Sequence, residues 1–205
     1  MRHLITNLNP RSPISEQFRT VRTNLQFSSV DSALQSIIVT SAGPSEGKSL
    51  TAANLAVVYA QQEKRTLLID ADLRKPTVHY TFRIDNLRGL SNVLIGDCTL
   101  EDAVETSSVD HLDLLSCGPI PPNPSELLAS KRMEEVLTHA NHLYDFVIFD
   151  TPPVLAVTDA KILANIVDGS LLVVRSGTTE LEDVEQAAER IKDSKAGLLD
   201  RKSVV

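Results

Sequence analysis

The sequence predicts an α/β fold in which one parallel sheet is covered by helices on both faces, so that the molecule has three layers. Two observations support this prediction. Short apolar runs alternate along the chain with longer stretches of helical pattern, as in strand-helix-strand units. The apolar runs are nearly continuous, which is typical of strands buried on both faces.

Five strands and five helices follow from this pattern. The strands are predicted over residues 36–40, 66–70, 112–115, 146–150 and 170–174. The helices are predicted over residues 15–27, 48–62, 125–143, 159–166 and 182–193. Asn123-Pro124 and Thr158-Asp159 supply helix-starting residues. The proline-rich stretch 118–124 predicts a rigid loop rather than a linker between domains.

Length and composition predict one globular domain. The 205 residues suffice for a sizeable core, and 42% hydrophobic with 23% charged residues is ordinary for a soluble domain. The longest apolar run, 55–60, is far shorter than the roughly 20 residues of a membrane-spanning helix, and no secretory signal opens the chain. We therefore expect a cytoplasmic protein. The net charge of -7 disfavours nonspecific nucleic-acid binding, although a local basic patch remains compatible with it.

The cysteines and histidines give no sign of a metal or nucleophile site. Cys98 and Cys117 form no CxxC pair and have no histidine at ligand spacing, so two buried thiols are expected rather than a zinc site. The five histidines are scattered, and we expect them to be surface or packing residues: His3, His79, His111, His139 and His142.

A phosphate-binding loop is predicted directly after the first strand. The Gly-Lys-Ser triplet 47–49 sits between a predicted strand and a predicted helix, where backbone N–H groups cradle phosphates and the lysine neutralises them. Ala42 stands where the standard pattern has glycine, so the match is imperfect. The predicted nucleotide-binding residues are Gly43, Pro44, Ser45, Glu46, Gly47, Lys48, Ser49 and Leu50.

Three aspartates end predicted strands near this loop. Asp70 and Asp72 are two residues apart, so an extended chain turns both side chains the same way, and Asp150 ends another strand. Taken singly, each could be a turn or capping residue. Because ligands of parallel sheets bind beyond the carboxyl ends of the strands, their convergence with the loop predicts a magnesium nucleotide site. Ser49, Asp70 and Asp150 are the predicted metal ligands.

At these motifs the chain resembles the bacterial tyrosine kinases over nearly its whole length. The shared segments are the loop, Ile-Asp-Ala-Asp-Leu-Arg at 69–74, Asp-Thr-Pro at 150–152, Gly-Leu-Ser at 89–91 and the stretch 118–128. The resemblance implies an ATP- and Mg²⁺-dependent protein-tyrosine kinase of capsular or extracellular polysaccharide production. A tyrosine hydroxyl has a pKa of about 10, so a carboxylate must accept its proton.

The resemblance also distributes roles among the site residues. Asp70 is the expected base, Asp72 assists the metal or the base, and Lys48 draws charge from the phosphates, so these three form the predicted catalytic set. Arg74 could bind phosphate or pack, and the sequence does not decide.

An N-terminal charged stripe resembles the family's oligomerisation motif. Glu16, Arg19 and Arg22 recur every third residue, which places them along one helix face. A solvated surface stripe is the plain alternative, and the resemblance favours a ring of subunits. It also implies a separate membrane protein that recruits and activates the kinase at the inner face of the membrane.

Two other functions remain open. Partitioning and septum-positioning ATPases share the loop but carry an additional lysine where this chain has Gly43, and the absence of that lysine, with Pro44 following, argues against this group. A nucleotide-dependent scaffold would keep the loop and the aspartates without phosphorylating anything. Members of the family usually end in a tail with clustered tyrosines, and the lack of such a tail here favours the scaffold. The tyrosines of this sequence are Tyr59, Tyr80 and Tyr144, of which the first and last are expected to pack.

The expected organisation is one kinase domain over 1–205. It comprises an oligomerisation helix region over 1–30, a nucleotide-binding core over 36–199 and an atypical, truncated or frameshifted end over 200–205. Relative to the family, this end predicts loss of the last strand and an exposed sheet edge.

Overall fold

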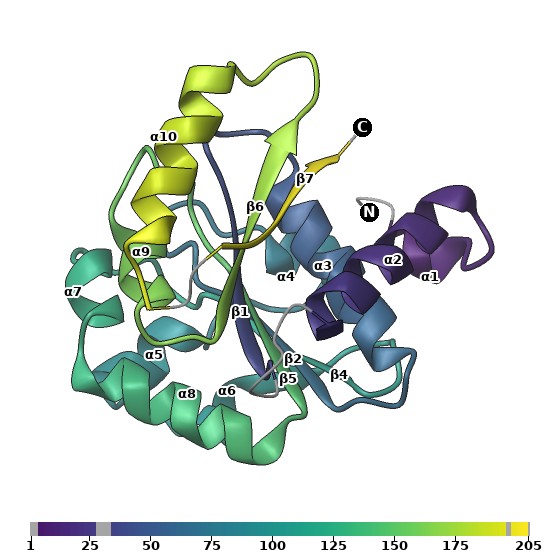
Figure 1. The fold of residues 1–205 in the computed structure, drawn as a ribbon. Coiled ribbons are helices and arrows are strands. Elements are labelled where there is room, and N and C mark those ends of the chain that lie inside the picture. The colour runs from purple at the N-terminus through teal and green to yellow at the C-terminus, as the bar shows by residue number, and fades with distance from the viewer. Residues whose placement is uncertain (1–3, 28–33, 196–197, 205) are drawn as a thin grey trace.

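The computed structural model describes residues 4–27, 34–195 and 198–204. It holds one seven-stranded sheet of order β3-β4-β2-β5-β1-β6-β7 (Figure 1). All neighbouring strands are parallel except β3 and β4, which are antiparallel. The strands are β1 (Ser36–Ser41), β2 (Thr66–Asp70), β3 (Val104–Thr106), β4 (Leu112–Leu115), β5 (Phe146–Asp150), β6 (Gly169–Arg175) and β7 (Leu198–Val204).

Helices cover both faces, so the predicted three layers are confirmed. One face carries α1 (Ile5–Leu8), α2 (Pro13–Phe27), α3 (Lys48–Ala60) and α4 (Val78–Phe82). The other carries α5 (Leu90–Ile95), α6 (Leu100–Ala103), α7 (Pro124–Leu128), α8 (Lys131–Leu143), α9 (Asp159–Ala164) and α10 (Leu181–Lys192). Figure 1 shows α2 and α3 on one side of the central strands and α8, α9 and α10 on the other.

The central strands divide the core in two by side-chain alternation. Leu67 and Ile69 of β2 pack under the face with α8 and α9, whereas Leu68 packs under α3. Successive strand residues point to opposite faces. Asp70 therefore points to the α3 face, toward the helix that begins at Lys48.

Two predicted elements differ from the structure. The helix expected over 125–143 is two helices, because Ser130 is extended (φ -76°, ψ 153°) and starts α8 anew after α7 ends. The last strand, expected to be lost, is present: β7 pairs in parallel with β6, with Val173 opposite Lys202. Strand pairing uses backbone groups, so the polar residues of this edge strand do not prevent it.

Short elements add to the predicted set. The segments α1, α4, α5, α6 and β3 have at most six residues each, too few for a clear period. Among the residues that the structure describes, no helix is long and apolar enough to cross a membrane.

Candidate active site

Strand register brings two of the predicted aspartates together. β5 lies between β2 and β1, and Asp150 is the register partner of Asp70 on one side and of Val39 on the other. β1 leads directly into the phosphate-binding loop. The carboxyl ends of these three strands thus set both carboxylates beside the loop, where parallel sheets bind ligands.

The loop presents its backbone to solvent. Pro44, Ser45 and Gly47 are exposed, and Ser45 (φ 64°) and Gly47 (φ 94°) adopt left-handed conformations. Gly47 precedes α3, and no side chain caps the N-terminus of that helix. Free N–H groups at a helix N-terminus favour a phosphate.

Two further loop residues differ in exposure and contacts. Glu46 Oε1 accepts the N–H of Gly43 at 3.1 Å and so braces the loop from inside. Leu50, in the first turn of α3, is partly exposed at 39%.

Lys48 lies among the carboxylates. Its Nζ is 3.0 Å from Asp72 Oδ2, 3.4 Å from Asp150 Oδ1 and 3.1 Å from Ser49 Oγ. Burial alone would lower the pKa of Lys48, but Asp150 and Asp72 outweigh it and raise that pKa. The ammonium is therefore a fixed positive charge in a buried acidic cluster.

Asp70 is strongly perturbed by its surroundings. Burial, followed by the neighbouring Asp150, raises the pKa of Asp70 to about 8. Its Oδ2 accepts the N–H groups of Thr77 and Val78, each at 2.9 Å, and these bonds act in the opposite direction. Sequence reasoning missed these two backbone donors, because no side-chain pattern announces them.

Two buried oxygens of the strand-end aspartates have no hydrogen-bond partner among the described residues. They are Asp70 Oδ1 and Asp150 Oδ2, and a third buried carboxylate oxygen without a partner, Glu46 Oε2, lies in the phosphate-binding loop. Burial also raises the pKa of Asp150, against the opposing effects of Lys48 and of a hydrogen bond with Ser49. Buried polar oxygens are normally satisfied, so this pair of oxygens fits a bound cation.

The donor set matches the chemistry of Mg²⁺. This ion prefers oxygen ligands and is usually held by one or two carboxylates together with phosphates and water. The predicted ligands Ser49, Asp70 and Asp150 supply such oxygens at the loop. Within the described ranges, no three His, Cys, Asp or Glu side chains form a complete metal site of their own.

Arg74 is an ion-pair residue that ties three segments together. Its Nε and Nη2 donate to the two carboxylate oxygens of Asp159 at 2.8 and 3.1 Å, and Nη2 also donates to Ser125 Oγ at 2.9 Å. Ser125 Oγ is 2.7 Å from Asp159 Oδ1. The hydrogen bonding and charge of Asp159 hold the pKa of Arg74 above its ordinary value, against the opposing effect of burial. We call Arg74, Ser125 and Asp159 the arginine clamp.

The clamp is adjacent to Asp72, one of the three aspartates near the loop. The backbone N–H groups of Arg74 and Lys75 donate to Asp72 Oδ1 at 3.4 and 3.0 Å. Asp159 is fully buried, and the sequence identified it only as a helix-starting residue.

The N-terminal stripe is not a single exposed face. Glu16 and Arg19 pair with each other at the surface. Arg22 is instead buried at 8% exposure, and its Nη1 donates to the carbonyl of Val58 in α3 at 2.8 Å. The expectation of one charged stripe through all three residues is therefore wrong for Arg22.

The cysteines and histidines have ordinary environments. Cys117 is buried as expected, whereas Cys98 is only partly buried, and both are free thiols. His79 stacks on Tyr80, His139 pairs with Glu101 at 2.7 Å, and His111 and His142 are exposed. His3 lies outside the described residues.

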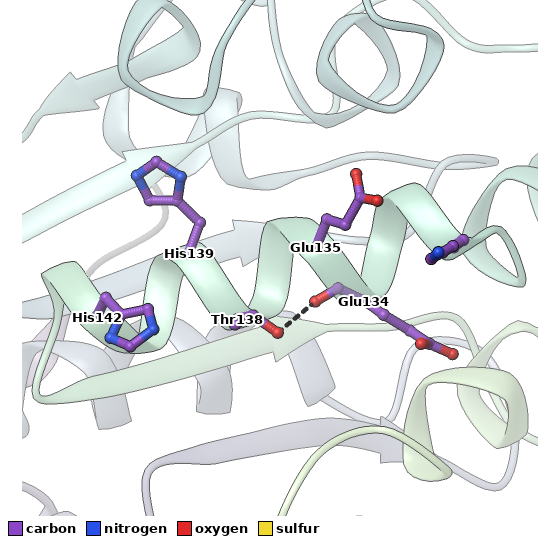
Figure 2. Close-up of a pocket in the computed structure, with 6 residues that line it drawn as sticks. Glu134, Glu135, Thr138, His139 and His142 are labelled. Atoms are coloured by element: carbon purple, nitrogen blue, oxygen red, sulfur yellow. Dashed lines mark hydrogen bonds between the residues drawn. The ribbon is translucent and has the colours of Figure 1, made fainter.

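A surface hollow on α8 is separate from this site. Figure 2 shows its side chains along one helix, with Thr138 Oγ1 donating to the carbonyl of Glu134 at 2.8 Å. Its lining residues are Lys131, Glu134, Glu135, Thr138, His139 and His142. None of them belongs to the phosphate-binding loop or to the aspartate cluster.

Comparison with known proteins agrees with the site. The family described as AAA domain matches residues 35–201. The tyrosine-protein kinase YwqD of Bacillus subtilis (strain 168) is 56% identical over 198 residues, which cover 97% of this chain and 84% of that protein.

Solved structures give the same assignment. The chimerical protein CapA2B2 superposes with a TM-score of 0.93 at 44% identity, covering 97% of this chain and 87% of that chain. The kinase domain of the Escherichia coli tyrosine kinase ETK superposes with a TM-score of 0.90 at 36% identity, covering 99% and 83%.

A more distant structure represents the competing ATPases. The septum site-determining protein MinD of Pyrococcus horikoshii OT3, complexed with Mg-ADP, has a TM-score of 0.67 at 25% identity and covers 80% of this chain and 67% of that chain. The match to the tyrosine kinases is closer in both identity and fold. The chain belongs to the family of bacterial tyrosine kinases.

Proposed function

We propose that this kinase transfers the γ-phosphoryl group of Mg-ATP to tyrosine hydroxyls with Asp70 as the base. The observation that carries the proposal is the register pair Asp70 and Asp150, each with one unpartnered buried oxygen, and the 3.4 Å contact of Asp150 Oδ1 with Lys48 Nζ. The backbone of 43–49 binds the phosphates, with Leu50 in the same helix turn. Lys48 draws charge from the phosphates as the transfer proceeds.

The carboxylates divide the remaining work. Ser49, Asp70 and Asp150 would hold Mg²⁺, which supplies charge neutralisation at the transferring phosphoryl group. Asp72 keeps Lys48 in place through the 3.0 Å contact. Asp70 takes the tyrosine proton, and positive charge near it lowers its pKa from the metal-free value of about 8.

A phosphorylation assay tests this assignment. Purified protein is incubated with labelled ATP, Mg²⁺ and a tyrosine-rich acceptor peptide, beside Asp70→Ala and the exposed-site control Asp110→Ala. We expect phosphotyrosine with wild type and with the control, and none with Asp70→Ala. Normal transfer by Asp70→Ala would refute Asp70 as the base.

A nucleotide-dependent scaffold is the alternative. It predicts tight ATP binding with no phosphotyrosine in any arm of the same assay, and none when a cytoplasmic segment of the activator is added to each arm.

The family role carries over as part of the proposal. We infer that the kinase regulates capsular or extracellular polysaccharide production and is recruited to the inner face of the membrane by a separate activator. The likeness to CapA2B2 and YwqD supports this inference. Binding of the purified chain to membrane vesicles only when the activator's cytoplasmic segment is present would test it.

Ring assembly is proposed on a reduced set of residues. Glu16 and Arg19 remain exposed or partly exposed on α2, whereas Arg22 anchors that helix to α3. Region 1–30 would thus contribute Glu16 and Arg19 to a neighbouring subunit, with the core over 36–199 providing the facing surface. The end at 200–205 lies largely in β7 and extends the sheet.

A further inference from the structure

The three tyrosines of this sequence differ sharply in accessibility. Tyr59 is 2% exposed and stacks on Phe146 with ring centroids 3.8 Å apart. Tyr144 is partly buried, and its hydroxyl donates to Asp113 Oδ2 at 3.0 Å. Tyr80 is 71% exposed. Only Tyr80 therefore offers its ring to another protein without unfolding or breaking a hydrogen bond to a carboxylate.

Tyr80 also lies beside the catalytic site. It is in α4, the short helix whose first N–H group, that of Val78, donates to Asp70 Oδ2 at 2.9 Å. The neighbouring ring of His79 packs against it with centroids 3.9 Å apart. The helix that carries Tyr80 is thus hydrogen-bonded through its first residue to the proposed base.

We propose that Tyr80 is a phosphoacceptor that one copy of this chain presents to the active site of another copy. The proposal rests on the proposed kinase function. Asp70 is fully buried beneath the start of α4, whereas the Tyr80 ring faces solvent, so the ring points away from its own base. Transfer between copies accounts for an exposed acceptor ring and a buried base in the same chain.

The step is an ordinary phosphoryl transfer. Tyr80 Oη of one copy forms a bond to the γ-phosphorus of ATP held by the other copy. The bond from that phosphorus to the bridging oxygen breaks, its electron pair leaves with ADP, and the phenol proton passes to Asp70 of the ATP-binding copy.

The local charge suits the product. Exposed Lys75 and Arg83 flank Tyr80 within five residues along the chain. Phosphorylation adds nearly two negative charges, which cationic side chains stabilise.

Site mapping with matched hydroxyl deletions tests the proposal. Wild type, Tyr80→Phe and Tyr144→Phe are incubated with Mg-ATP and an acceptor peptide, and phosphotyrosine is located by mass spectrometry. We expect Tyr80→Phe to lose the self-label while it still phosphorylates the peptide, and Tyr144→Phe to keep both. Self-label that persists in Tyr80→Phe, or its absence from wild type that phosphorylates the peptide, overturns the Tyr80 assignment alone. Failure to label the peptide overturns the kinase function, and the proposal with it.

A mixing experiment tests transfer between copies. A tagged Lys48→Met chain, which keeps Tyr80 but lacks the catalytic lysine, is mixed with untagged Tyr80→Phe enzyme. Label on Tyr80 of the tagged chain is expected. An unlabelled tagged chain, in a mixture where the peptide is labelled, shows that Tyr80 is not presented in trans.

Discussion

Asp70, the proposed base, lowers the stability of the folded chain when it ionises. Its pKa is about 8 in the folded chain and near 3.8 when unfolded, so between these values the folded state holds a proton that the unfolded state has released. The free energy of unfolding therefore falls as pH rises from about 4 to about 8. Above that range the carboxylate is ionised in both states and the loss is complete.

Asp70→Asn should raise stability while it abolishes transfer. The amide oxygen can still accept the N–H groups of Thr77 and Val78, but the side chain cannot ionise. We expect a gain of about 1–3 kcal/mol at pH 8, shrinking toward pH 5, in urea unfolding monitored by circular dichroism. Asp110→Asn serves as the exposed control, and a variant less stable than wild type at pH 8 contradicts the prediction.

Lys48 should contribute to stability as well as to catalysis. Without its ammonium, the buried carboxylates of Asp72 and Asp150 lose their counter-charge. Removing one partner of a buried ion pair costs about 3 kcal/mol. We therefore expect Lys48→Met to unfold at lower urea concentration and Lys48→Arg to recover part of the loss without activity. Unchanged stability of Lys48→Met would show that the pair is energetically neutral.

At the scale of elements, the arginine clamp links the segment after β2 to α7 and α9. Its energy should appear as coupling between Arg74 and Asp159 in a double-mutant cycle of Arg74→Ala and Asp159→Asn. We expect a coupling free energy of about 1–2 kcal/mol in urea unfolding. Because the backbone of Arg74 also binds Asp72, both single variants should lower kcat more than they raise the KM for ATP. If the stability losses of the two single variants simply add in the double variant, the Arg74 and Asp159 side chains are not energetically coupled.

Different residues of helix α2 should affect stability and oligomerisation. Arg22→Ala removes the bond to Val58 and leaves that α3 carbonyl without this donor, so a loss of about 1–2 kcal/mol is expected. Glu16→Ala and Arg19→Ala should leave stability nearly unchanged and shift the protein toward monomer in analytical ultracentrifugation. Dissociation by Arg22→Ala with no loss of stability would argue for a direct interface role.

Helix geometry explains why sequence spacing misplaced Arg22. A helix has about 3.6 residues per turn, so each step of three residues lags a full turn by roughly 60°. Glu16, Arg19 and Arg22 therefore spread over roughly 120° of the helix surface. That is enough to turn the last residue onto α3, and only tertiary packing reveals it.

The elements themselves were predictable to the extent that side chains encode them. The core strands, such as 66–70 and 146–150, were placed to the residue because both of their faces are buried and apolar. β7 was not, because an edge strand of polar residues is defined by its partner β6 and not by its own pattern. The loop was predictable from its motif, and the three aspartates were predictable from their places at strand ends. The backbone N–H groups of Thr77 and Val78 that bind Asp70 were not, because their position depends on the path of the folded chain.

For the whole molecule, nucleotide binding should raise stability far more with Mg²⁺ than without it. A ligand that binds the folded state alone stabilises by about 2.7 kcal/mol at a concentration one hundred times its Kd. Thermal unfolding should therefore shift upward with ATP and Mg²⁺, and much less with ATP and a chelator. In Asp150→Asn, the upward shift of the unfolding temperature should be the same with Mg²⁺ and with the chelator. An equal shift under both conditions in wild type would show that the oxygens of Asp70 and Asp150 do not hold the metal.

Because Asp70 and Asp150 are register partners, the proposed catalysis depends on the register between β2 and β5. A displacement of β5 by one residue toward its carboxyl end would turn Asp150 to the opposite face and set Phe149 opposite Asp70. One added residue within 146–150 would thus erase the chemistry, while the same addition in the exposed turn near Asp110 would leave the alignment intact. Whether an insertion abolishes activity should therefore depend on whether it shifts the hydrogen-bonded pairing of the strands. Its distance from the phosphate-binding loop should matter much less.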